Sequence, residues 1–261
     1  VIDIDPVTDT ASKPFRVAAL QTVSGPDVAA NLVVAGALAE EAAAGGAQLA
    51  VLPEYFGILG LRDTDKLAAR ERPGHGPIQD FLAATARRLG LWLVGGSVPL
   101  DAGVDDRVYN SSLVYTPTGE LAARYDKIHL FGLELGAESF REARTILPGN
   151  SVATVAMPFG RMGLSICYDL RFPELYRAMG RVDAILIPAA FTATTGAAHW
   201  DILMRARAIE NQCYVIAPAQ GGVHPSGRRT HGNSMIVDPW GTVVAERTEE
   251  GPGVVFADLD P

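Results

Sequence analysis

Short apolar runs of strand length alternate with longer amphipathic segments along this chain, and that alternation restricts the fold to the α/β class. The first apolar run, residues 15–20, precedes an alanine-rich segment at 27–44 that ends on Gly45-Gly46, a common stop for a helix. Further strands are predicted at 48–52, 91–98, 152–155, 162–166, 183–188, 213–217, 235–238, 242–245 and 253–257, and further helices at 77–89, 173–179 and 199–211. We therefore expect one α/β domain of mixed sheets packed on each other, with helices outside.

Two other segments complete this outline. Residues 108–115 and 120–125 flank a Thr-Pro-Thr-Gly turn signature, which predicts a hairpin. Residues 126–150 show no clear period and predict a long functional loop. No linker or low-complexity stretch divides the chain. We expect a flexible N-terminal arm over residues 1–13 and a single domain over 14–261.

Charge and cysteine content exclude several classes of protein. The formal net charge is −8 and the isoelectric point is about 5.1, so neither nucleic acid nor an anionic membrane is an expected partner. The two cysteines, Cys167 and Cys213, cannot build a disulfide framework or a zinc-type cysteine cluster. No apolar run approaches the roughly 18 residues of a membrane span. A reducing, cytoplasmic setting is the expected one.

The stretch SICYDLRFPEL at residues 165–175 is the first candidate for chemistry. An apolar run ends at Cys167, a charged turn follows, and Pro173 opens a predicted helix. A lone cysteine is more often a core residue than a nucleophile. A strand end just before a helix N-terminus nevertheless favours the thiolate, the form in which cysteine attacks. Cys213 lies in an apolar run without adjacent charges, so we interpret it as a packing residue.

A thiol nucleophile needs a base and a group that stabilises an oxyanion. The five histidines leave a Cys–His pair open as one arrangement; they are His75, His129, His199, His224 and His231. Glu54 follows the apolar run at 48–52 among apolar and aromatic neighbours, where burial would raise its pKa and make it a base near neutral pH. Taken alone, a solvated loop acid is the commoner outcome for such a residue.

Lys127 ends the second strand of the predicted hairpin and precedes further apolar residues. A fixed ammonium there could stabilise a tetrahedral oxyanion and hold the base and the thiol in place. A surface lysine that extends its head into water is the alternative interpretation. Each of the three signals is therefore moderate by itself.

Together, the motifs LPEYF at 52–56, YDKIHLF at 125–131 and CYDLRFPE at 167–174 occur in an order that resembles the nitrilase superfamily of carbon–nitrogen hydrolases. The resemblance covers about residues 15–259. It implies a four-layer α-β-β-α sandwich of the nitrilase type, an α/β fold, and a reaction that needs no metal or organic cofactor. It also implies Glu54 as general base, Lys127 as the oxyanion-stabilising and proton-donating residue, and Cys167 as nucleophile.

A second glutamate near the lysine is a common feature of this superfamily. Glu138, in the loop that follows Lys127, matches that residue, with Glu134 as the alternative. The same resemblance makes the backbone N–H of Tyr168 part of the oxyanion site. Arg171 is expected to pair either with a substrate carboxylate or internally with an acidic neighbour, Asp169 or Glu174. Further pocket candidates are Tyr55, His129, Phe191, Thr192, Thr195 and Trp200, the last equally interpretable as packing.

Three more stretches match the branch of the superfamily that includes deaminated-glutathione amidases and ω-amidases: TTGAAHW at 194–200, RARAIENQCY at 205–214 and SMIVDPWG at 234–241. The resemblance implies a cysteine-dependent amidase that hydrolyses a small carboxylate-bearing amide to a carboxylate and ammonia through a thioester. It further implies a homodimer or larger homo-oligomer. An N-carbamoyl amide hydrolase, a nitrilase with the same triad, and a catalytically silent binding protein of the same fold remain open, since Asn233 and the loop at 132–138 depart from that branch.

Overall fold

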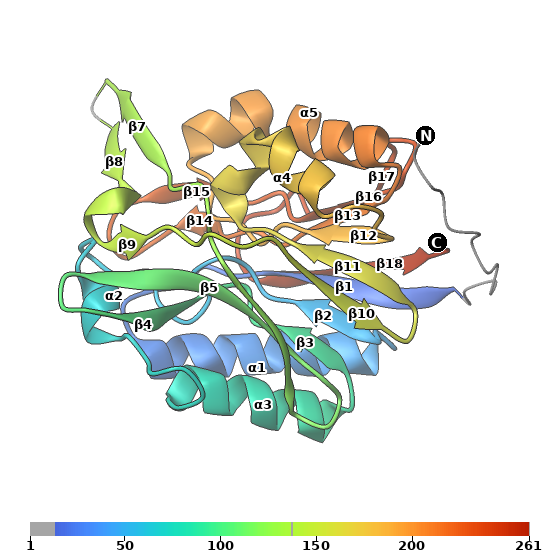
Figure 1. Ribbon diagram of the computed structural model, residues 1–261, viewed down its shortest axis with the longest axis horizontal. Coiled ribbons are helices and arrows are strands. Elements are labelled where there is room, and N and C mark those ends of the chain that lie inside the picture. Colours follow the sequence, from blue (N-terminus) through green and yellow to red (C-terminus); the bar gives the residue numbers. More distant parts are fainter. Residues whose placement is uncertain (1–13, 137, 261) are drawn as a thin grey trace.

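The computed structural model describes residues 14–136 and 138–260, and it places two sheets face to face between two layers of helices (Figure 1). The expected N-terminal arm, residues 1–13, lies outside the described residues. Helices α1 (Val28–Ala44) and α3 (Pro77–Leu89) cover one outer face, and α4 (Pro173–Ala178) and α5 (Ala193–Asn211) cover the other. This arrangement confirms the four-layer α-β-β-α sandwich.

The first sheet is built around three parallel strands, β1 to β3. Its order within the described residues is β18 (Gly253–Leu259), β1 (Phe15–Gln21), β2 (Leu49–Val51), β3 (Trp92–Val94), β5 (Arg107–Tyr115) and β4 (Val98–Val104), with β6 (Leu121–Asp126) and β9 (Ile146–Leu147) also paired to β5. The β5–β6 pair is the hairpin predicted from its turn signature.

The second sheet likewise has a parallel centre, here of strands β11 to β13. Its order in the described part of the chain is β10 (Ala153–Met157), β11 (Gly160–Leu164), β12 (Ala184–Leu186), β13 (Tyr214–Ala217), β16 (Met235–Val237) and β17 (Val243–Glu246). Two small antiparallel pairs lie outside these sheets: β7 (Gly132–Leu135) with β8 (Glu138–Arg141), and β14 (Gly221–Val223) with β15 (Arg229–His231).

Strand periodicity explains why two sheets stack. Successive side chains of a strand point to opposite faces. On β1, Val17 and Ala19 therefore join the core shared with the second sheet, whereas Ala18 and Leu20 join the core beneath α1 and α3. All four side chains are fully buried. A strand that is apolar on both faces needs a layer on each side, which accounts for the sandwich.

Local chemistry fixes the helix ends. Asp27 caps α1 by accepting a hydrogen bond from the Ala30 N–H at 3.2 Å, and Thr192 caps α5 by accepting one from the Thr195 N–H at 3.2 Å. Pro173 stands at the start of α4, where a missing N–H costs nothing. Among the described residues, no helix is both long and apolar enough to cross a membrane.

Three expectations need correction. Residues 126–150 are not an irregular loop, since they hold β7, β8, the 3-10 turn η1 (Glu142–Arg144) and β9. Helix α5 begins at Ala193 rather than at residue 199, because the Thr192 cap compensates for the weak helix formers in its first turn. The predicted strand at 91–98 breaks at Gly95-Gly96 into β3 and the start of β4.

Candidate active site

Three segments that end strands place the expected catalytic residues together. Glu54 comes shortly after β2, Lys127 directly after β6, and Cys167 shortly after β11, at the start of the 3-10 turn η2 (Cys167–Arg171). Side chains that follow parallel strands meet at the carboxyl edge of a sheet, where open α/β folds form their ligand crevices. The structure brings all three residues to one place, although they are far apart in the sequence.

Lys127 is the fixed centre of this group. Its side chain is fully buried, and its Nζ lies 2.8 Å from Glu54 Oε1 and 2.9 and 3.1 Å from the two oxygens of Glu142. Burial disfavours the ammonium, but attraction to Glu142 and Glu54 exceeds that cost and raises the pKa of Lys127. Lys127 is therefore a permanent cation held between two carboxylates.

The second carboxylate is Glu142 in the structure, whereas the sequence motifs point to Glu138. Glu138 begins β8, and its side chain lies outside the described part of the structure. Glu134, the alternative, is exposed and pairs with Arg141 at 2.8 Å instead. Glu142 lies at the start of η1, directly after the β7–β8 hairpin. Because the two strands of the hairpin are antiparallel, the chain comes back beside Lys127 at Glu142.

Glu142 is itself tightly positioned. It accepts hydrogen bonds from the Tyr55 hydroxyl at 2.7 Å and from the Phe131 N–H at 2.7 Å, in addition to its contacts with Lys127. Burial opposes its ionisation, but Lys127 and these donors outweigh burial and lower its pKa. Burial, with the nearby Glu142 and Glu54 charges, raises the pKa of Tyr55 well above its usual value, so the phenol stays a donor.

Glu54 has one engaged oxygen and one available oxygen. Its Oε1 accepts from Lys127 at 2.8 Å and from Asn110 Nδ2 at 2.9 Å, whereas its Oε2 accepts from no described residue. The turn that carries it is held by Gly96, where a Cβ atom would lie 1.9 Å from the Pro53 carbonyl oxygen. Only glycine permits that approach, and it brings the Ser97 hydroxyl to 2.9 Å from the Tyr55 N–H.

Cys167 has the strained backbone typical of a functional residue. Its φ angle is 51°, a left-handed conformation that costs energy for any residue but glycine. Its N–H donates to the Pro188 carbonyl at 3.0 Å, so it is already engaged. The N–H of the next residue, Tyr168, bonds to no described residue and is free to act as a donor. That free donor fits the expected oxyanion site.

The surroundings of Cys167 favour the neutral thiol. Burial raises its pKa well above the usual value, the Glu54 charge raises it further, and Lys127 offsets only part of this effect. Burial and Glu54 thus act against the thiolate that the following helix was expected to favour. The buried Cys213 is a packing residue, as expected, and both cysteines are free thiols.

Asp169 ties the cysteine turn to the lysine segment. Its two oxygens accept from the Tyr125 hydroxyl at 2.7 Å, the Ile166 N–H at 2.9 Å, and both the N–H and Nδ1 of His129 at 3.0 and 2.7 Å. The His129 ring stacks on Phe172 with centroids 3.7 Å apart. His129 therefore belongs to this brace, and it does not line the cavity beside the thiol.

The cavity beside the thiol holds about 280 Å³ of empty space, with its open mouth included. It is lined by Glu54, Phe131, Glu142, Cys167, Tyr168, Arg171, Ala190, Phe191, Thr192, Thr195 and Arg228. Five of the predicted pocket residues thus line it: Tyr168, Arg171, Phe191, Thr192 and Thr195. Tyr55 lines an adjoining outer pocket instead. Trp200 is buried and donates to the Asn233 carbonyl at 2.8 Å, which is a packing role.

Arg171 does not form the internal ion pair that was one of its two expected roles. Within the described residues, it forms no salt bridge with Asp169 or Glu174. Its guanidinium instead lies 5.6 Å from the ring centre of Tyr168, 5.5 Å from that of Phe191, and 3.3 Å from His199 Nδ1. The cation is therefore available to a ligand in the cavity.

Two residues at this site, Glu142 and Arg228, are not singled out by the sequence motifs. An acidic residue in the 126–150 segment is the only signal for Glu142, and several acidic residues share that segment. Arg228 lies in the turn between β14 and β15, directly before β15, and this short strand pair has no clear sequence pattern.

Among the described residues, no cluster of three or more His, Cys, Asp or Glu side chains could hold a metal ion.

Comparison with known proteins identifies the family of this chain. The family model described as carbon-nitrogen hydrolase matches residues 16–261. A deaminated glutathione amidase from Synechocystis is 43% identical over 255 residues, which cover 95% of this chain and 93% of that protein. The crystal structure of Nit3 from Saccharomyces cerevisiae, in branch 10 of the nitrilase superfamily, superposes with a TM-score of 0.86 at 34% identity, covering 96% of this chain and 92% of that one.

A third comparison is with a structure that is modified at its own active-site cysteine. An amidase variant from Nesterenkonia sp. AN1 carries the acetamide moiety of fluoroacetamide bonded to its active-site cysteine. That structure matches with a TM-score of 0.80 at 27% identity, over 96% of this chain and 92% of that chain. The fold, the family model and the relatives all agree, and we conclude that the chain belongs to the carbon-nitrogen hydrolase family.

Proposed function

We propose that this carbon–nitrogen hydrolase is an amidase in which Cys167 attacks the amide carbon, Glu54 moves the proton and Lys127 stabilises the oxyanion. The observation that carries the proposal is the shared cavity: Glu54 and Cys167 both line it, and the buried Lys127 Nζ lies 2.8 Å from Glu54. A base and a nucleophile at one cavity, with a fixed buried cation beside the base, are the requirements of acyl transfer through a covalent intermediate.

Acylation begins from the neutral thiol. Glu54 Oε2 accepts the thiol proton while sulfur bonds to the amide carbon, so no free thiolate accumulates in the enzyme. The Tyr168 N–H and the Lys127 ammonium stabilise the oxyanion that forms. The carbon–nitrogen bond then breaks, and the leaving nitrogen takes the proton from Glu54. Ammonia leaves from a primary amide and an amine from a substituted one, and the acyl group remains on Cys167 as a thioester.

Deacylation repeats the proton transfer with water. Glu54 removes a proton from water as its oxygen attacks the thioester carbon, and the same donors stabilise the second oxyanion. The carbon–sulfur bond breaks, sulfur recovers its proton, and the carboxylate product leaves. Glu142 acts in both steps as a positioning residue, because it holds Lys127 through both of its oxygens.

Arg171 is the proposed binding residue for a carboxylate on the acyl part of the substrate. It lines the cavity and forms no ion pair with a described carboxylate, and guanidinium binds carboxylate in a bidentate geometry. The name of the Synechocystis relative, deaminated glutathione amidase, supports a substrate of this kind. We propose carboxylate-bearing amides of the deaminated-glutathione or ω-amide type as substrates.

Amide hydrolysis by matched variants tests the proposal. The wild type should release amine or ammonia from deaminated glutathione, α-ketoglutaramate or succinamate, and Cys167→Ala should release none while remaining folded. Glu54→Gln should also lose turnover, whereas Cys213→Ala should keep it because Cys213 only packs. Full turnover by Cys167→Ala would refute the nucleophile, and full turnover by Glu54→Gln would assign the base elsewhere.

The assembly and the compartment are also proposals. Helix α5 exposes Ile202 and Ile209, and Trp240 nearby is 87% exposed, so this side of the molecule carries the apolar surface that a homodimer needs. The free thiols Cys167 and Cys213 fit a reducing compartment such as the cytoplasm.

A further inference from the structure

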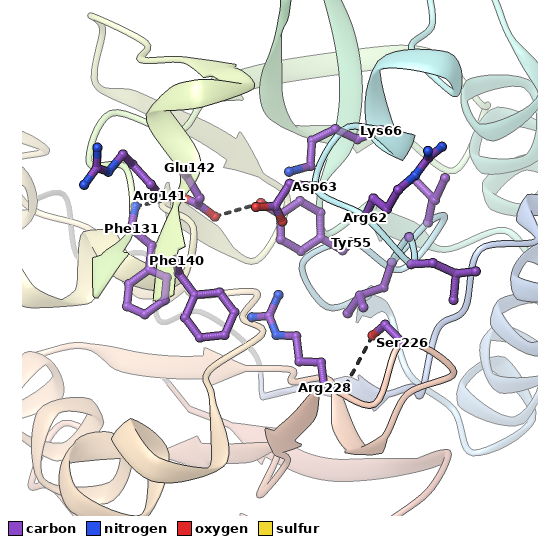
Figure 2. Close-up of a pocket in the computed structure, with 14 residues that line it drawn as sticks. Tyr55, Arg62, Asp63, Lys66, Phe131, Phe140, Arg141, Glu142, Ser226 and Arg228 are labelled. Atoms are coloured by element: carbon purple, nitrogen blue, oxygen red, sulfur yellow. Dashed lines mark hydrogen bonds between the residues drawn. The ribbon is translucent and has the colours of Figure 1, made fainter. Parts of the chain in front are cut away.

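The outer pocket beside the thiol cavity has no part in the mechanism described so far. It encloses about 850 Å³ of empty space with its open mouth included, against about 280 Å³ for the thiol cavity. Phe131, Glu142 and Arg228 line both spaces, so the two adjoin. Tyr55, the residue after Glu54, lies on the wall of the outer pocket (Figure 2). The outer pocket is thus next to the group that protonates the leaving nitrogen.

The outer pocket is rich in cations, but only some of them are available to a ligand. Its cationic lining residues are Arg62, Lys66, Arg141 and Arg228. Arg62 pairs with Asp65 at 3.0 Å, and Arg141 pairs with Glu134 at 2.8 Å. Both are largely exposed at the rim, where such pairs contribute little. The positive charge that remains available to a ligand belongs to Lys66 and Arg228.

Lys66 points into the pocket without an anionic partner. Its Nζ contacts the Thr145 hydroxyl at 3.2 Å and lies 5.7 Å from the ring centre of Tyr55. Within the described residues, no carboxylate lies within ion-pair distance of it. Burial lowers the pKa of Lys66; the more distant charges of Glu142 and Asp63 oppose this effect, and Arg228 and Lys127 add to it. A bound anion would relieve that burial cost.

Arg228 approaches the same space from the other side of Tyr55 (Figure 2). One of its Nη atoms donates to the Ala190 carbonyl at 2.7 Å, and its guanidinium lies 5.2 Å from the ring centre of Phe140. Its Nε is buried and bonds to no described residue. An unpaired buried donor of a charged group costs free energy unless a ligand satisfies it.

We propose that Lys66 and Arg228 form a subsite for a carboxylate on the amine half of the substrate, which makes the enzyme selective for N-substituted amides that are anionic at both ends. This inference rests on the proposed amidase function. Arg171 follows Cys167 on η2 and lines the thiol cavity but not the outer pocket, so it takes the acyl carboxylate. The leaving amine then extends into the outer pocket, receives the Glu54 proton as the carbon–nitrogen bond breaks, and departs through the open mouth.

Two substrates that differ in one group test the subsite. Deaminated glutathione carries a carboxylate on its amine half, and its analogue with that carboxylate converted to a carboxamide does not. The wild type should show a kcat/KM for the acid at least about 10-fold above that for the carboxamide, as expected for a hydrogen bond to a charged group. Lys66→Met should reduce this ratio about 10-fold, and Lys66→Arg should retain most of it.

The exposed rim residue provides the matched control. Arg62→Gln removes a cation from the same pocket, but one already paired with Asp65, so the ratio should stay at the wild-type value. Thermal unfolding of each variant checks that it is folded. Arg228→Lys should lower the same ratio, because a lysine cannot supply the Nε donor.

The outcomes separate the two proposals. Hydrolysis of α-ketoglutaramate, with equal kcat/KM for the acid and its carboxamide, would overturn the subsite and leave the amidase function intact. A wild-type preference that Lys66→Met retains would also overturn it. Hydrolysis of none of these amides by the wild type would overturn the proposed function, and the subsite with it.

Discussion

Replacing Lys127 by methionine tests whether one buried cation holds the two carboxylates of the site. Its Nζ lies 2.8 Å from Glu54 and 2.9 Å from Glu142. At about 3 Å and an effective dielectric constant of about 20, each attraction is worth about 5 kcal/mol before desolvation is subtracted. Removing one partner of a buried ion pair costs about 3–5 kcal/mol, because the remaining charge stays buried. We expect Lys127→Met to lower the free energy of unfolding by that amount near neutral pH.

The pH dependence of this loss gives a sharper test. In the wild type, Lys127 lowers the pKa of Glu142, so the stability from this pair is present above the unfolded pKa of about 4.3 and is lost only as pH falls through the folded pKa. In Lys127→Met, burial without the cation raises the pKa of a carboxylate. The folded variant therefore binds a proton more readily than the unfolded variant does. Its free energy of unfolding falls as pH rises from the unfolded pKa of about 4.3 through the raised folded pKa.

The stability gap between wild type and variant should accordingly be larger at about pH 7.5 than at about pH 5. One proton contributes at most about 1.4 kcal/mol per pH unit, so the gap should shrink by about 1–3 kcal/mol. Urea unfolding followed by tryptophan fluorescence at both pH values measures it. Lys66→Met is the control, since Lys66 pairs with no described carboxylate and should cost less than about 1 kcal/mol. A Lys127→Met loss that is equal at both pH values would refute the account.

Further predictions concern the residues around the triad. Four donors contact the Asp169 carboxylate, and Asp169→Asn leaves two of them facing an NH2 group. The free energy of unfolding should therefore fall by about 3–5 kcal/mol, and kcat should fall more than KM changes. An unchanged melting temperature would contradict the bracing role of Asp169. Arg171→Gln should raise KM for succinamate about 10-fold or more, and an unchanged KM would exclude it as the carboxylate ligand. Light scattering should give a mass above the 27.6 kDa of one chain, and a monomer would refute the proposed dimer.

Much of the site could be predicted from strand ends. Glu54 and Cys167 each follow an apolar run and Lys127 ends a strand of the predicted hairpin, and topology brings such strand ends together. The cavity residues Phe191, Thr192 and Thr195 follow the same logic, because they lie beyond β12 at the start of α5. The packing of each sheet between two layers could also be predicted, because apolar runs such as residues 15–20 are apolar on both faces of the strand.

Other features depend on contacts that no local pattern encodes. Glu142 reaches Lys127 only because β7 and β8 fold into a hairpin, and the segment 126–150 has no period that predicts one. Burial raises the pKa of the Cys167 thiol, an effect that a local helix-dipole argument omits. Arg228 lines the same cavity as Cys167 because the β14–β15 pair, which is distant from Cys167 in the sequence, packs beside the site.

The central claim is that hydrolysis passes through an acyl group bonded to Cys167. Wild-type enzyme mixed with deaminated glutathione or succinamate, quenched in acid during turnover and digested, should give a Cys167 peptide heavier by the acyl group, with the Cys213 peptide unmodified. Mass spectrometry of the two peptides makes the measurement. Two results together would contradict the account: wild-type turnover without any adduct on Cys167, and turnover by the Cys167→Ala variant.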